Sequence, residues 1–142
     1  MNIHHMKIAS AFILIFSSGI AAAEVKVIAN NSVSDSGLSA DTIADMFLGK
    51  TNSLPSGHKA VPVDQDEGSA VRDEFYTKAT KKDAAQLKAY WSRLIFTGKG
   101  QPPKAVADDS DVVAQVSANP DAIGYVSGNA NTAGVRVLLT IH

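Results

Sequence analysis

The chain has 142 residues, with 13 Lys and Arg against 14 Asp and Glu, and it contains no cysteine. This near-neutral balance argues against nucleic acid as a partner. The chain also lacks an arginine-rich or lysine-rich stripe with interleaved aromatic side chains. The absence of cysteine excludes a disulfide framework, so a hydrophobic core must stabilise the fold.

Residues 1–23 have the pattern of a secretory signal peptide. Lys7 closes a short n-region, residues 8–20 are mostly apolar, and residues 21–23 are three alanines that match a cleavage site. The apolar run is short for a transmembrane helix, and no second run follows it. We therefore expect an exported, periplasmic domain of residues 24–142 that does not span a membrane after processing. Its length suits one compact domain.

Alternation between strand-like and helix-like patterns along the chain predicts an α/β architecture. We expect a strand over residues 24–29, and then a helix that begins after Ser39, a favourable N-cap, and stops at Gly49. A second strand is expected over residues 60–63, and a second helix after Ser69.

The most regular helical pattern covers residues 84–96. Its stripe at i, i+4, i+7 and i+8 predicts a helix with four residues in the core, namely Leu87, Trp91, Leu94 and Ile95. Ser110 is expected to cap a shorter helix that ends at Asn119. Two strands, over residues 122–126 and 134–141, are expected to close the chain.

Residues 61–75 combine a short strand, a glycine turn and a helix start. Gly68 precedes Ser69, which is placed to cap the helix. A glycine lets the backbone approach a ligand closely, and a capping hydroxyl beside unpaired helix amides favours an anion. The same residues also make an ordinary turn and cap. Both interpretations remain open from the residues alone.

The sequence shows no arrangement of catalytic or metal-binding residues. Beyond residue 23, histidine occurs only at His58 and His142, so a Ser-His-Asp triad or a histidine metal site lacks partners. The acidic residues from Asp64 onward do not form an EF-hand loop, because the twelfth position is Phe75 instead of Glu. We therefore expect neither an enzyme nor a bound metal or cofactor.

Several segments, taken in order, resemble a known family. They cover residues 38–50, 61–64, 67–69, 87–98 and 122–126. Their order is similar to that in the phosphate-binding substrate-binding proteins of ABC transporters, especially the short members of the periplasmic-binding-protein-like group. The resemblance implies a type-II periplasmic-binding-protein-like α/β domain with a mostly parallel sheet flanked by helices. It also implies inorganic phosphate or a similar oxyanion as the ligand.

In the larger members of that family, an Arg and an Asp precede a Ser-Gly-Thr turn that holds the phosphate. The matching turn here carries Gly68 and Ser69, but no Arg stands just before it and the Thr is missing. Arg72, one helical turn further on, is the candidate replacement. An ordinary surface ion pair between Arg72 and nearby acids is the alternative.

A second group of candidate ligand residues is the loop after the first strand, with Asn31, Ser32 and Ser34. We expect this loop at the carboxyl edge of the sheet, where α/β proteins bind ligands. Simple solvation of a polar loop is the alternative. Since the chain is about one lobe long, the expected cleft is half-formed and the expected binding is weak.

Two functions follow from these patterns. The first is a solute-binding module that takes phosphate or a similar oxyanion and serves ABC-type phosphate uptake or sensing, with a permease or an envelope sensor as partner. The second is a protein-interaction module of the cell envelope that keeps the fold without tight anion binding. The retained Gly68 and Ser69 favour the first function, and the missing Arg and Thr favour the second.

Overall fold

The structure is a computed structural model that describes residues 23–142. The signal peptide predicted over residues 1–23 lies almost wholly outside the described residues and stays a prediction. Within residues 23–142, no helix has both the length and the apolar character needed to cross a bilayer.

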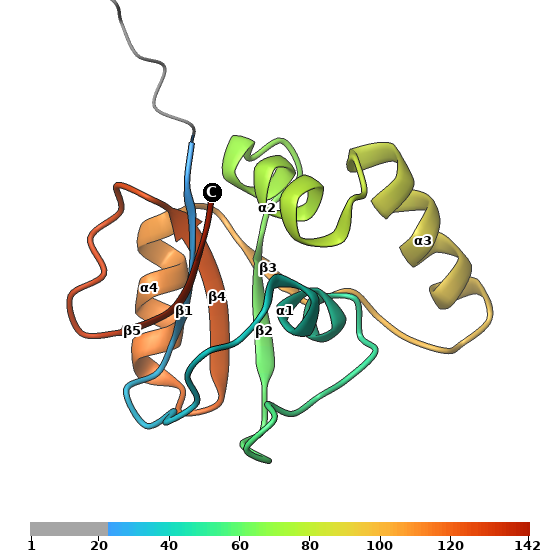
Figure 1. Cartoon of the computed structure of the whole chain (residues 1–142). Coiled ribbons are helices and arrows are strands. Elements are labelled where there is room, and N and C mark those ends of the chain that lie inside the picture. The colour runs from blue at the N-terminus through green and yellow to red at the C-terminus, as the bar shows by residue number, and fades with distance from the viewer. Residues whose placement is uncertain (1–22) are drawn as a thin grey trace, which may run out of the picture.

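The chain folds into five strands and four helices over the described residues (Figure 1). In chain order they are β1 (Val25–Ala29), α1 (Ala40–Phe47), β2 (Val61–Gln65), α2 (Ala70–Thr80), α3 (Ala84–Phe96), β3 (Lys104–Val106), α4 (Asp109–Ala118), β4 (Ala122–Ser127) and β5 (Arg136–Ile141). The strand order in the sheet is β3-β2-β4-β1-β5.

Strand direction confirms the predicted mostly parallel sheet. β2 pairs in parallel with both β3 and β4, whereas β1 pairs antiparallel with β4 and with β5. Four strands therefore point the same way, and β1 alone among the described strands runs against them. This reversal decides which loops can meet at one edge of the sheet.

Helices cover both faces of the sheet. α4 lies on one side, where Val112 and Val116 pack on Ile28, Val63 and Val126. α1 and α2 lie on the other side, and α3 stands further out beyond them (Figure 1). The larger core on this second side includes Val25, Val27, Ile43, Met46, Phe47, Phe75, Leu87, Trp91, Tyr125 and Ile141.

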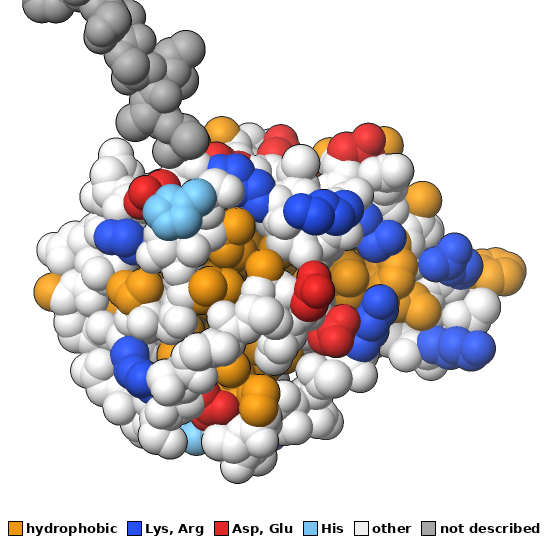
Figure 2. All heavy atoms as spheres, in the orientation of Figure 1, with side chains coloured by type: hydrophobic (Ala, Val, Ile, Leu, Met, Phe, Trp, Pro, Cys, Tyr) orange, Lys and Arg blue, Asp and Glu red, His pale blue; other side chains and the backbone are white. Residues whose placement is uncertain are grey.

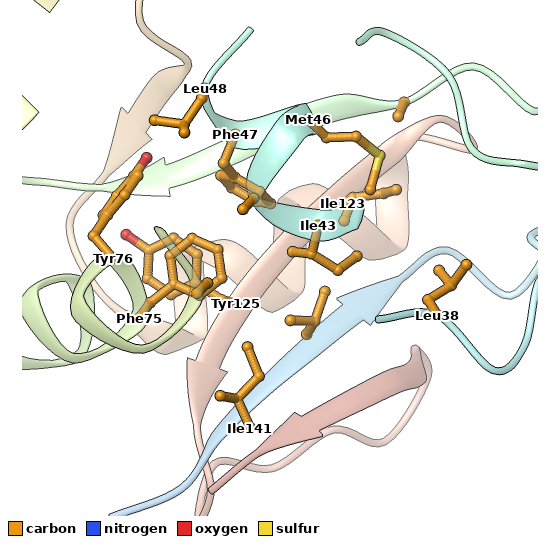
Figure 3. Packing of buried hydrophobic residues seen from close by; sticks show 14 of the residues in the cluster. Leu38, Ile43, Met46, Phe47, Leu48, Phe75, Tyr76, Ile123, Tyr125 and Ile141 are labelled. Carbon is orange, nitrogen blue, oxygen red and sulfur yellow. The ribbon is translucent and has the colours of Figure 1, made fainter. Parts of the chain in front are cut away.

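Aromatic rings form the centre of the larger core (Figure 3). The rings of Phe75 and Tyr125 stack with centroids 4.1 Å apart, and Phe47 meets Phe75 edge-on at 4.8 Å. Such pairs add about 0.5–1.5 kcal/mol beyond area burial. They hold α1 and α2 on β4, and this fixes the start of α2 relative to the sheet.

The helix starts follow from side-chain caps. Ser39 and Ser69 each accept a hydrogen bond from the amide three residues on, as predicted. The prediction that Ser110 caps α4 is wrong, because Asp108 accepts the amide of Asp111 at 2.9 Å and takes that role. The negative charge of an ionised carboxylate is stabilised at the positive N-terminal end of a helix. Asp108 is therefore the more favourable N-cap, and Ser110 lies within the first turn of α4.

Three further expectations need correction. Ile95 is 53% exposed, so the stripe of α3 does not bury all four residues; Leu87 and Trp91 are buried, and Leu94 is half-buried. β3 was not predicted, because its three residues are too short to show a period. β2 extends to Gln65, which brings Asp64 into the sheet as a buried residue.

Gly124 on β4 permits the close approach of α4. A Cβ atom at this position would lie 2.4 Å from Cγ1 of Val112 and 3.3 Å from Cγ2 of Val116. We expect Gly124→Ala to lower the free energy of unfolding by about 1–3 kcal/mol, because α4 must shift to relieve the overlap. Urea denaturation measures the loss. Gly57→Ala is not a suitable control because its φ is positive; Ser117→Ala, at an exposed position of α4, should change the stability by less than about 0.5 kcal/mol.

Candidate functional site

The carboxyl edge of β2 leads into the predicted glycine turn. Gly68 has φ of +90°, a conformation that favours glycine, and Ser69 follows as the N-cap of α2. The Ser69 hydroxyl donates to Oε1 of Gln65 at 2.8 Å and accepts the amide of Arg72 at 3.2 Å. No partner among the described residues takes the amides of Ala70 and Val71. The turn therefore presents two free N–H groups and the positive end of α2.

A hollow of about 330 Å³ opens beside this turn, between the first turns of α2 and α3. Its lining carries two cations and two acids and consists of Glu67, Gly68, Arg72, Asp73, Ala84, Ala85 and Lys88. The structure thus brings Gly68 and Arg72 together, as the sequence predicted, and adds Lys88. Because the first turns of two helices meet here, both helix dipoles favour an anion in the hollow.

Arg72 is held at the wall of this hollow by buried groups. Its Nε atom lies 3.7 Å from Oδ1 of Asp64, too far for a hydrogen bond, and the guanidinium carbon lies 5.6 Å from the ring centre of Tyr76. Nε is buried and has no hydrogen-bond partner among the described residues. Arg72 therefore forms an ion pair, but with a buried carboxylate instead of the surface acids expected as the alternative.

Asp64 is part of the core. It is 2% exposed and accepts hydrogen bonds from the hydroxyls of Tyr76, at 2.7 Å, and of Tyr125, and from the amide of Gln65. Burial raises the pKa of this carboxyl, and the tyrosine hydrogen bonds and Arg72 oppose the rise. With its oxygens taken by the tyrosines, Asp64 is not placed to accept a proton from a bound oxyanion.

A second hollow, of about 400 Å³, lies further along the same edge, at the end of β4 and the start of α4. Asp109, Ser110, Ser127, Asn129 and Asn131 supply its polar lining. The Asp109 carboxylate accepts the side-chain amide of Gln65 at 2.8 Å and the hydroxyl of Ser127 at 2.6 Å. A carboxylate of the protein itself thus accepts the hydroxyl of Ser127 in the lining of this hollow.

The expectation that the loop after β1 shares this edge is wrong. Ala29, the last residue of β1, pairs with Ile123 near the start of β4, so the loop emerges at the opposite edge from Gly68. Asn31 there donates to the carbonyl of Gly134 at 3.1 Å, and Ser32 donates to that of Pro120 at 3.1 Å. Ser34 is exposed on the same loop. Asn31, Ser32 and Ser34 therefore lie apart from Gly68, Ser69 and Arg72.

The described residues contain no group of three His, Cys, Asp or Glu side chains placed to hold a metal ion. The acids near the turn are spread between the core, where Asp64 lies, and the exposed loop of Asp66 and Glu67. This edge carries amides, hydroxyls and cations, which bind anions through hydrogen bonds and charge, and also the carboxylates of Glu67, Asp73 and Asp109.

Comparison with solved structures finds the same fold in phosphate receptors. An ABC-type phosphate transport receptor from Vibrio cholerae superposes with a TM-score of 0.64 at 14% identity, over 82% of this chain and 45% of that one. A phosphate ABC transporter substrate-binding protein with bound phosphate, from Clostridium perfringens, superposes with a TM-score of 0.59 at 21% identity, over 82% of this chain and 44% of that one. PstS from Borrelia burgdorferi superposes with a TM-score of 0.63 at 14% identity, over 82% of this chain and 46% of that one. The chain has the periplasmic-binding-protein-like fold.

The chain spans less than half the length of these receptors. No family model and no curated protein matches the sequence. The three structures are described as a transport receptor, a substrate-binding protein and PstS, and none of these descriptions names an enzyme. At these identities the likeness establishes the fold, and the ligand must be argued from the site.

Sequence reasoning missed Lys88, Asp109 and Ser127. Lys88 directly follows the buried Leu87, so the helical pattern predicts only that it is exposed. The sequence around it does not show that the start of α3 lies beside the start of α2. A cap at Ser110 would place Asp109 before the helix, whereas Asp109 lies in the first turn of α4. The helix start was the available signal, because an acid in the first turn of a helix lies close to the strand ends at that edge of the sheet.

Proposed function

We propose that this protein is a periplasmic solute-binding module that binds phosphate or a similar oxyanion weakly. The site is the hollow lined by Gly68, Arg72 and Lys88, and Ser69 adjoins it as the N-cap of α2. The observation that carries the proposal is the meeting of two helix starts and two cations at one hollow of about 330 Å³. The fold shared with phosphate receptors supports it.

Weak binding follows from the charges in the hollow. The free amides of α2 and the Arg72 guanidinium each offer a charge-assisted hydrogen bond worth about 1.5–3 kcal/mol. Glu67 and Asp73 stand in the same lining and repel a dianion. Because association costs at least about 4 kcal/mol, we expect a dissociation constant of about 0.1–1 mM.

In the cell, the proposed role is ABC-type phosphate uptake or sensing, with a membrane permease or an envelope sensor as partner. Export through the signal peptide of residues 1–23 would place the module where such partners present their outer faces. No reaction is proposed, since the hollow offers binding groups without a paired nucleophile and base.

Isothermal titration with phosphate and then with sulfate tests the proposal. We expect saturable heat with phosphate at low salt that persists at about 0.15 M salt, because amides in a hollow are screened less than surface charges. Heat that disappears at this salt concentration would show nonspecific attraction. Absence of heat up to about 10 mM ligand, ten times the weakest expected dissociation constant, would contradict the proposal.

A protein-interaction module is the second candidate function. The observation that favours it is the carboxylate of Asp109, which accepts hydrogen bonds from Gln65 and Ser127 at the neighbouring hollow. A carboxylate held there blocks a second anion at the same donors. In that case the edge would retain its shape for a protein partner, and phosphate would produce no heat.

A further inference from the structure

The outer end of α3 exposes large hydrophobic side chains. Phe96, its last residue, is 91% exposed, and Ile95 is 53% exposed. Trp91 and Leu87, one and two turns earlier, are buried against the body of the protein. The helix is thus anchored at one face, and its C-terminal end carries an aromatic and an aliphatic side chain into solvent.

Positive charge is concentrated along α3 and in the segment that follows it. Residues 84–107 contain four cations, Lys88, Arg93, Lys99 and Lys104, and no Asp or Glu. None of the four forms an ion pair with any residue of the described part of the chain. In Figure 2, the α3 end, at the right of the view, shows hydrophobic side chains between Lys and Arg side chains.

The cations and the hydrophobic residues share the outer surface of the helix. Arg93 and Phe96 are three residues apart and therefore neighbours on one helical face. Lys99 follows in the exposed loop after Gly98. The guanidinium carbon of Arg93 lies 5.9 Å from the ring centre of Tyr90, and Arg93 forms no ion pair with a described residue. An exposed aromatic side chain beside cations without ion pairs is typical of a surface that inserts shallowly into an anionic lipid interface.

We propose that the end of α3, formed by Arg93, Ile95, Phe96 and Lys99, docks on the surface of an anionic phospholipid bilayer. Charge complementarity argues for this occupant, because the negative headgroups attract Arg93 and Lys99. A lipid surface does so whichever side of the helix each cation lies on. The end of α3 projects outward from the body (Figure 1), and Ile95 and Lys99 line a hollow of about 270 Å³ there. The inference goes beyond the proposed anion binding, and none of the four residues that form the end of α3 lines the hollow at Gly68.

The expected affinity has two contributions. Each Lys or Arg near an anionic surface strengthens binding about fivefold. Insertion of the Phe96 and Ile95 side chains removes apolar area from water and strengthens binding about tenfold or more. Neither contribution alone anchors a protein, and together they give reversible, salt-sensitive attachment.

Flotation with lipid vesicles tests this inference. The protein recovered after export, with its N-terminus verified by mass, is mixed with vesicles of phosphatidylglycerol and phosphatidylcholine or of phosphatidylcholine alone. We expect at least about tenfold stronger binding to the anionic vesicles. The double variant Ile95→Ser with Phe96→Ser should lose about tenfold on the anionic vesicles, and Lys99→Gln about fivefold.

Two matched controls separate this surface from the rest of the protein. Val137→Ser removes another exposed aliphatic side chain, from β5, and Lys59→Gln removes an exposed cation from the loop before β2; both should bind within twofold of the parent protein. All five substituted side chains are exposed, so the four variants should fold. Excess inorganic phosphate should leave vesicle binding unchanged, because the lipid contact lies outside the hollow at Gly68.

A fluorescence measurement checks insertion directly. In Phe96→Trp, the new indole should shift its emission to shorter wavelength on anionic vesicles, while the buried Trp91 contributes a constant background. Equal binding of the parent protein and the Ile95→Ser, Phe96→Ser variant would overturn the inference. Equal binding to neutral and anionic vesicles, or no binding to either, would also overturn it and leave a protein as the occupant of this surface.

Discussion

Replacing Asp64 with alanine is expected to lower the free energy of unfolding by about 3–5 kcal/mol. The carboxylate accepts the hydroxyls of Tyr76 and Tyr125 and lies beside Arg72, all in the interior. Its removal leaves the hydroxyl hydrogens of Tyr76 and Tyr125 without an acceptor and the half-buried Arg72 without its counter-charge. The Tyr125 oxygen still accepts the amide of Gln65. Chemical denaturation followed by circular dichroism measures the change.

Two further variants make the result specific. Asp64→Asn keeps the shape and one acceptor oxygen, and we expect about half the loss of Asp64→Ala because one tyrosine retains its hydrogen bond. Asp66→Ala removes an exposed acid two residues on and should change stability by less than about 0.5 kcal/mol. If Asp64→Ala cost no more than Asp66→Ala, Asp64 would have no structural role in the core.

Replacing Ser69 and Arg72 together with alanine is expected to abolish measurable phosphate binding. Ser69 caps α2 and sets the direction of its first amides, and Arg72 supplies the inner cation of the hollow. Loss of the guanidinium alone removes about 1.5–3 kcal/mol, or ten- to a hundredfold in affinity. Together with the loss of the Ser69 cap, this raises the expected dissociation constant from about 0.1–1 mM to about 10 mM or more, the highest phosphate concentration in the titration.

The test requires that the variant still fold, since Arg72 also faces Asp64. A single cooperative melting transition establishes this. Lys88→Gln provides an independent variant, because Lys88 is exposed and should weaken binding about threefold without loss of stability. Lys104→Gln, an exposed cation on β3 outside the lining of the hollow, makes the same change in net charge and should leave binding unchanged. Unaltered binding in Ser69→Ala, Arg72→Ala would remove this turn from the site.

Much of the local structure was already present in the sequence. The cap at Ser69, the glycine turn at Gly68 and the limits of α3 follow from residue types and from a 3.6-residue period, which act within one or two turns of chain. The resemblance to phosphate receptors rested on such segments in order, and the fold comparison agrees with it. The prediction that Ile95 lies in the core is wrong, because periodicity assigns a residue to a helix face but does not show how far along the helix that face is covered by the rest of the protein.

The tertiary structure decided which of these local features meet. The direction of β1 comes from its pairing with β4 and with β5 at the far end of the chain, and alternation along a strand carries no information on direction. That pairing moved Asn31 and Ser32 away from the candidate site. Packing of α3 against α2 brought Lys88 to the hollow, and the burial of Asp64 between two tyrosines withdrew it. Such contacts join residues far apart in sequence, so no local pattern contains them.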